Sequence, residues 1–150
     1  MGMFDALNVS ATGLTAERLR MDVTAENLAN AQTTRGADGQ PYRRKEVVLS
    51  EVQSGGFGSQ LANAIGAGSA SGFQPGGVEV AGITQDQTPG KLVYDPGHPD
   101  ADAKGYVRMP NVDTVAEMVD LISASRAYEA NVTAMNAAKQ MFSKTLDLLR

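Results

Sequence analysis

The residues best suited to chemistry lie together from Asp95 to Asp102 (DPGHPDAD), a segment that holds the single histidine, His98. Its carboxylates could ligate calcium, but an EF-hand needs ligands at alternate positions, a central glycine and a distal glutamate. A histidine can change charge near neutral pH, yet no hydroxyl has an evident base beside it. We therefore predict a rigid turn made by Pro96, Gly97 and Pro99, with solvated acids, no metal and no catalytic residue.

Two other stretches could carry chemistry. The glycine-rich run from Gly66 to Gly77 lacks the Gly-Lys-Ser/Thr ending of a phosphate-binding loop, so a flexible loop is the better reading. The basic triplet Arg43-Arg44-Lys45 could touch nucleic acid or an acidic protein partner. One triplet in an acidic chain is more often a solvated face, and we expect that here.

Composition excludes several classes of protein. The chain has 150 residues, 13 basic and 17 acidic, with no cysteine, no tryptophan and 42% hydrophobic residues. The absence of cysteine excludes disulfides, thiolate metal sites and a thiol nucleophile, and the acidic balance disfavours a nucleic-acid binder. No run is long enough to span a membrane, and the first 20 residues lack the pattern of a cleavable secretory signal. We expect no cofactor and no small-molecule substrate.

A long helix is predicted over residues 4–31. Its apolar residues recur at spacings of three and four, and four of them repeat every seven residues, as in a coiled-coil seam: Leu7, Leu14, Met21 and Leu28. Gly13 is the weak point, because glycine in a helix interior costs about 1 kcal/mol relative to alanine.

A second, stronger helix is predicted over residues 114–149, with Asn111 or Asp113 as its N-terminal cap. Its length would be on the order of 50 Å at 1.5 Å per residue, more than so small a chain can wrap. Its seam residues recur at spacings of three and four, and its apolar and aromatic members are Met118, Leu121, Tyr128, Val132, Met135, Phe142, Leu146 and Leu149.

The middle of the chain, residues 35–112, differs in kind. It holds all six prolines and most of the glycines. Short alternating or β-branched runs at 42–51, 77–84, 91–94 and 105–109 predict three or four strands in one small β-rich unit. Residues 53–76 are rich in glycine, serine and alanine and predict a flexible surface loop, with one short helix at 60–65.

These elements predict an α+β protein of three parts: a helix over 1–34, a β-rich middle domain over 35–112, and a helix over 113–150. The middle is too small to cover two seams, so the helices must pair with each other, with other chains, or both. Packing against protein is the default for a leucine and methionine heptad. A membrane-surface helix would carry a more basic polar face.

Three stretches resemble a known family, the bacterial flagellar axial proteins of the rod and hook. Residues 14–34 (LTAERLRMDVTAENLANAQTT) resemble its N-terminal signature, although Glu26 takes a place where many members have Ser or Asn. Residues 110–149 resemble its C-terminal signature, and the segment from Val93 to Asp102 narrows the resemblance to the proximal rod. The matching motif residues are Asn27, Asn30, Arg126, Tyr128, Asn131, Asp95, Pro96, Gly97 and His98.

The resemblance implies a structural, non-enzymatic subunit of the basal-body rod, a helical drive shaft that crosses the periplasm. It implies long terminal helices that form a coiled-coil inner domain. It also implies as partners other rod proteins, copies of the same chain, the surrounding membrane-ring protein and, in transit, the flagellar type III export apparatus. The alternatives are a different axial protein or a cytoplasmic coiled-coil adaptor or chaperone. An enzyme using His98 is disfavoured because no nucleophile, base and orienting group occur together.

Overall fold

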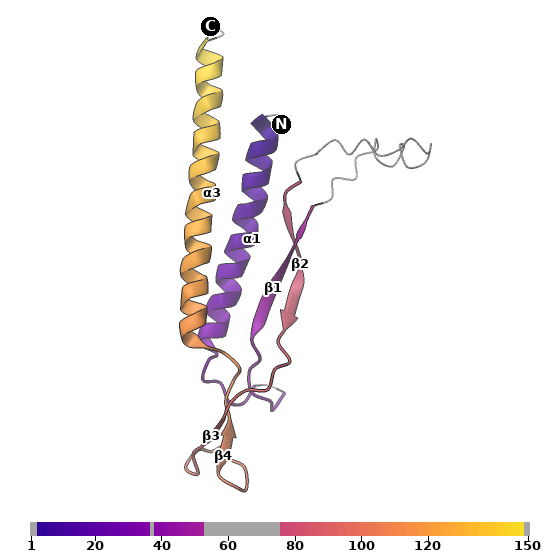
Figure 1. The fold of residues 1–150 in the computed structure, drawn as a ribbon, viewed down its shortest axis with the longest axis vertical. Coiled ribbons are helices and arrows are strands. Elements are labelled where there is room, and N and C mark those ends of the chain that lie inside the picture. Colours follow the sequence, from indigo (N-terminus) through magenta and orange to yellow (C-terminus); the bar gives the residue numbers. More distant parts are fainter. Residues whose placement is uncertain (1–2, 37, 53–75, 149–150) are drawn as a thin grey trace, which may run out of the picture.

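The computed structural model describes residues 3–36, 38–52 and 76–148, and its elements are two long helices with four short strands between them (Figure 1). Helix α1 spans Met3–Ala29 and helix α3 spans Thr114–Leu148. Between them come β1 (Lys45–Glu51), β2 (Val78–Gln85), β3 (Leu92–Tyr94) and β4 (Tyr106–Arg108). The predicted α+β class with long terminal helices is confirmed.

The two helices lie side by side and antiparallel (Figure 1). Their buried apolar side chains are small: Ala16 and Val23 on α1, and Ala124 and Ala138 on α3. Small side chains let the two backbones approach closely, and at Gly13 the α1 backbone lies against the side chain of Asn131 on α3. A Cβ at position 13 would lie 3.0 Å from the Nδ2 of Asn131, so the residue that weakens the helix permits its packing.

The helix ends follow local chemistry. Asp113 caps α3, because its Oδ1 accepts hydrogen bonds from the backbone N–H of Val115 at 3.0 Å and of Ala116 at 3.4 Å. Asn111, the other candidate cap, accepts instead from the backbone N–H of Arg44 at 2.9 Å. Helix α1 ends two residues before the predicted Ala31, in a turn where the N–H of Thr33 donates to the carbonyl of Asn30.

The strands form two separate antiparallel hairpins rather than the single β-rich unit predicted. Strands β1 and β2 pair from Lys45↔Gln85 to Glu51↔Val78, with a bulge between Val48 and Leu49. This hairpin lies along α1 (Figure 1), where the N–H of Val78 donates to the hydroxyl of Thr12 at 3.2 Å. The expected loop over 53–76 and short helix at 60–65 fall almost wholly outside the described residues.

The second hairpin, β3–β4, forms a small tip at the end of the molecule where α3 begins (Figure 1). Tyr94 and Tyr106 face each other across it with ring centroids 5.3 Å apart. Gly105 precedes β4 at a φ of 79°, a left-handed conformation that favours glycine, and lies against the Tyr94 ring. The one buried side chain of its two strands is that of Val107, so the tip has almost no apolar core of its own.

Candidate functional site

The most buried polar residues lie where α1 ends, β1 begins and α3 starts. Asn27 and Glu117 are each 1% exposed, and they are the largest fully buried side chains in the described part of the chain. The Asn27 Nδ2 donates to the Glu117 Oε2 at 3.1 Å. We call Asn27, Tyr42, Arg44, Lys45 and Glu117 the polar junction.

Asn27 uses its full hydrogen-bonding capacity in this junction. Its Nδ2 donates to the Lys45 carbonyl at 2.8 Å as well as to Glu117. Its Oδ1 accepts from the Lys45 N–H and the Tyr42 hydroxyl, both at 2.9 Å. A buried amide with two donors and two acceptors all satisfied stabilises one arrangement of its neighbours, because any other would leave polar groups without partners.

Arg44 provides the charge that balances buried Glu117. Its Nε donates to the Glu117 Oε1, and its Nη2 lies 3.4 Å from Asp120. The hydrogen bond to Glu117 raises the pKa of Arg44. The expectation that the basic triplet is a solvated face is therefore wrong for Arg44, which is 27% exposed and ion-paired within the chain. Lys45 is also paired, with Glu26, whereas Arg43 is exposed.

The pKa of Tyr42 is also changed by its surroundings in the junction. Burial, with the nearby carboxylates of Glu26 and Glu117, raises the pKa of Tyr42 to about 12. The hydroxyl donates to Asn27, and the raised pKa extends the range in which it stays protonated further into alkaline pH. Sequence reasoning missed Tyr42, Arg44 and Glu117 as site residues, since partners 15 to 90 residues apart in sequence leave no local pattern.

The predicted seam residues fall into two groups. Leu7, Leu14, Met21 and Leu28 of α1 are all half-buried, as are Leu121, Tyr128, Val132 and Met135 of α3. Others remain open to solvent in this chain: Met118 is 47%, Phe142 38% and Leu146 51% exposed. Leu149 lies outside the described residues.

The motif residues do not form one site. Asn27 lies in the polar junction, Asn131 packs against Gly13 halfway along the helices, and Arg126 is exposed. Asn30 closes the end of α1, where its Nδ2 donates to the Glu26 carbonyl at 2.9 Å. The DPGHPDAD segment lies in the tip, between β3 and β4, and so away from Asn131 in the middle of α3.

The DPGHPDAD segment is a turn built on its own hydrogen bonds. The Asp95 Oδ1 accepts from the Gly97 N–H at 3.1 Å, and the His98 Nδ1 accepts from the Asp100 N–H at 3.1 Å. Pro96 packs near Gly105. The described residues contain no group of three or more His, Asp or Glu side chains placed to hold a metal ion.

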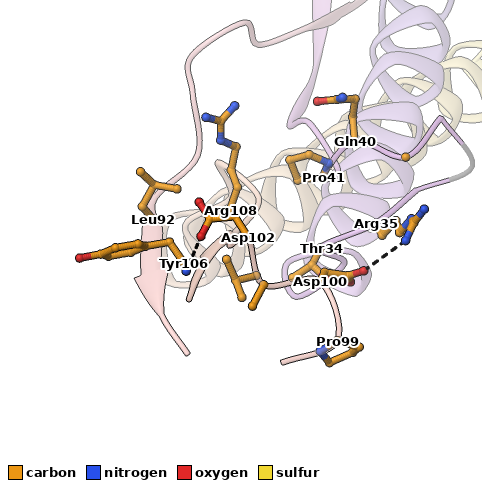
Figure 2. A pocket seen from close by; sticks show the side chains of 13 residues that line it. Thr34, Arg35, Gln40, Pro41, Leu92, Pro99, Asp100, Asp102, Tyr106 and Arg108 are labelled. Atoms are coloured by element: carbon orange, nitrogen blue, oxygen red, sulfur yellow. Dashed lines mark hydrogen bonds and ion pairs between the residues drawn. The ribbon is translucent and has the colours of Figure 1, made fainter. Parts of the chain in front are cut away.

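A hollow of about 460 Å³ separates this turn from the loop that follows α1 (Figure 2). At one side of the hollow, the Asp100 carboxylate accepts a hydrogen bond from the Thr34 hydroxyl at 2.8 Å and lies 3.7 Å from the Arg35 guanidinium. Asp102 accepts from the Tyr106 N–H at 3.0 Å. The acids were expected to be solvated, but Asp100 instead connects the tip to the loop that follows α1.

The geometry defines a class of protein: an elongated pair of helices whose buried polar groups form hydrogen bonds with other segments of the same chain. In the described residues neither helix combines the length and apolar character that crossing a membrane requires. Two family models match the ends of the chain, "Flagella basal body rod protein" over residues 7–37 and "Flagellar basal body rod FlgEFG protein C-terminal" over residues 103–148.

Full-length relatives give the particular family. The chain is 52% identical to flagellar basal-body rod protein FlgC of Bacillus subtilis, with 99% of each chain covered. It is 47% identical to the FlgC proteins of Borreliella burgdorferi, covering 100% of this chain and 99% of the relative, and of Escherichia coli, covering 99% and 98%. The chain belongs to the FlgC family of flagellar basal-body rod proteins. The predicted resemblance to flagellar axial proteins is confirmed, and the family is structural rather than enzymatic.

Proposed function

We propose that this chain assembles helically with copies of itself and with other rod proteins into the drive shaft that carries motor torque to the hook and filament. Its structural role in the proximal rod of the flagellar basal body follows from its family. The helical arrangement, the self-contacts and the torque are our extension of that role.

The observation that carries the proposal is an uncovered apolar stripe on α3. Val115, Met118, Val119 and Ile122 are 66%, 47%, 60% and 53% exposed. Their spacing of three and four places them on one face of the helix, which α1 does not cover. We call these four residues the outer stripe.

The physics of assembly follows from this stripe. Each square ångström of apolar surface removed from water contributes roughly 25 cal/mol, so covering a stripe along a helix favours association. If the stripe meets a different surface on the next subunit, the contact is heterologous. Heterologous contacts that do not close into a ring extend into a helical filament or tube, which is the form a shaft requires.

The proposal extends to location and further partners. We place the assembled chain in the periplasmic part of the rod, inside the surrounding membrane ring. We also expect the chain to pass through the flagellar type III export apparatus on its way there. The family resemblance supports these two statements, and the absence of cysteines that could crosslink an unfolded chain is compatible with the second.

Substitution within the outer stripe tests the proposal. Val119→Asp and Ile122→Asp place a charge on an exposed position, so the isolated chain should keep its helical circular dichroism. In cells lacking the native gene, we expect each variant to be missing from purified basal bodies and motility to be lost. Half-buried Leu121 and Met135 are less suitable positions, because a charge there would also disturb the helix pair.

The matched control is Val119→Thr, which keeps the β-branched shape and adds only a hydroxyl. We expect it to enter the rod and restore most of the swimming. Full incorporation of both Asp variants would show that the outer stripe is not an assembly contact and would overturn the proposal.

A further inference from the structure

The most deeply buried part of the packing surface between the helices carries little information about their register. Its most buried members are alanines, with Ala124 at 0% and Ala138 at 5% exposed on α3 and Ala16 at 3% on α1. Ala124, Asn131 and Ala138 are seven residues apart, so each presents a small side chain to the same line of α1. A shift of α3 by seven residues would bring Ala138 to the place of Asn131 against Gly13.

The lengths of the helices permit such a shift. Helix α3 has 35 residues and α1 has 27, so α3 exceeds its partner by more than one heptad. Figure 1 shows the C-terminal end of α3 standing beyond the start of α1. After a slip of seven residues, about 10 Å, α1 would still be covered along its length by α3. Helix length and the buried alanines therefore discriminate weakly between the two registers, although at half-buried positions the slip would put Tyr128 in the place of Leu121 and Lys139 in the place of Val132.

The polar junction does discriminate between them. The contacts Asn27–Glu117 and Gly13–Asn131 are both native, and they lie 14 residues apart on each helix, which is two heptads. In the slipped register Asn27 would face the region of Ala124, and Glu117 would lose Asn27. A buried carboxylate and amide left without partners cost far more than a lost surface contact.

The ion pair between Arg20 of α1 and Asp120 of α3 does not serve this purpose. The Arg20 Nη2 lies 3.9 Å from the Asp120 Oδ1, but both side chains are 39% exposed. Exposed pairs of this length contribute little to stability and re-form easily with other partners. The contact that discriminates between the two registers is therefore the buried one between Asn27 and Glu117.

We infer that the Asn27–Glu117–Arg44 cluster is a register clamp: it selects one of two heptad registers of α1 against α3 between which the buried alanines do not discriminate. Arg44 belongs to the segment that begins β1, so the same clamp sets the position of the first hairpin along the helix pair. This inference concerns the chain alone and does not depend on its assembly into a rod.

Disulfide trapping tests the clamp directly, because the chain has no native cysteine. Gly13→Cys with Asn131→Cys reports the native register. Gly13→Cys with Ala138→Cys reports the slipped one and also carries Asn131→Ala, because a Cβ at position 13 would otherwise lie 3.0 Å from the Asn131 Nδ2 in the native register. Both pairs are made in the full chain with and without Arg44→Met and Glu117→Leu, which replace the charged pair by apolar groups. Asn27 is kept, so that its bonds to Lys45 and Tyr42 remain.

With the clamp intact, we expect the 13–131 disulfide to dominate. With Arg44→Met and Glu117→Leu, the ratio of slipped to native disulfide should rise by about tenfold or more, the effect of losing one hydrogen bond to a charged group. Helical circular dichroism should be unchanged. Thr24→Val, an isosteric loss of a buried hydroxyl one turn before Asn27, is the control and should leave the ratio as it is.

Three results would overturn the inference. The first is an unchanged ratio in the Arg44→Met, Glu117→Leu chain. The second is equal trapping of both pairs with the clamp intact. The third is loss of helical signal in that double variant, which would make the cluster a general requirement for folding instead of a selector of register. As a further check, Glu117→Gln keeps an acceptor for Asn27 and should retain the native ratio.

Discussion

The polar junction and the C-terminal end of α3 are built on opposite principles, although the exposed outer stripe lies on the face of α3 beside the junction. At the polar junction, Asn27 and Glu117 are buried, and Arg44 balances the charge of Glu117. The end of α1, the start of β1 and the start of α3 meet there. At the other end, α3 continues past α1 with Met141 58% and Leu146 51% exposed. The junction is complete within one chain, whereas the far end presents apolar side chains that this chain does not cover.

This difference separates two sources of specificity. Buried polar groups tolerate few geometries, so the junction can fix how the elements of one chain are placed. Exposed apolar surface is non-directional and favours whatever covers it. A rod subunit needs both properties, because its own elements must be positioned before its uncovered faces can meet those of neighbours.

The largest effect should come from breaking the junction at Glu117. Glu117→Leu alone removes the main partner of Arg44 and should lower the free energy of unfolding by about 3 kcal/mol, as expected when one member of a buried ion pair is lost. Adding Arg44→Met should recover most of this loss, since the second charge is then absent as well. Urea unfolding followed by circular dichroism would measure both. Equal instability of the single and double variants would show that the charges are not coupled.

A smaller effect concerns pH at the same junction. The pKa of Tyr42 is raised to about 12 from the ordinary 10.0, so the folded chain holds this proton more tightly than the unfolded chain does. The stabilisation is complete below pH 10 and is lost as the pH rises through about 12. Tyr42→Phe should remove the tyrosinate absorbance step near pH 12 and flatten the fall in stability there. At neutral pH it should cost about 1 kcal/mol, for its hydrogen bond to Asn27. An unaltered spectroscopic titration in Tyr42→Phe would contradict the assignment.

Much of the fold could be predicted because its signals are local. Spacings of three and four gave both helices to within a few residues, and turn residues between β-branched runs located all four strands. The pairing of the strands into two hairpins could not be predicted, because it depends on how residues far apart in sequence meet. The polar junction was missed for the same reason. Arg44 looks like part of a solvated basic triplet until Glu117, 73 residues later, is placed beside it.

The seam shows a subtler limit of periodicity. The heptad pattern identified the large residues Leu7, Leu14, Met21 and Leu28, all half-buried, but the deepest positions belong to Ala16 and Val23. A search for large apolar residues favours those that flank a close-packed interface and overlooks the small ones at its centre. Gly13, which the helix propensity scale marks as a defect, belongs to that centre because it admits Asn131.

The smallest effect should come from the far end of α3, and it sharpens the contrast with Glu117. Met141→Ser and Leu146→Ser change side chains that are already more than half exposed, so each should alter the free energy of unfolding of the isolated chain by less than about 0.5 kcal/mol. Urea unfolding under the conditions used for Glu117→Leu gives the comparison directly. The same variants should reduce recovery of the chain in purified basal bodies, because a hydroxyl in place of an apolar group weakens any contact that excludes water. Stability loss comparable to that of Glu117→Leu would mean that the far end is held by the chain itself. Normal recovery in basal bodies would mean that no neighbour covers it. Either result would remove the distinction between a buried junction that organises the subunit and exposed apolar surface that is left for its neighbours.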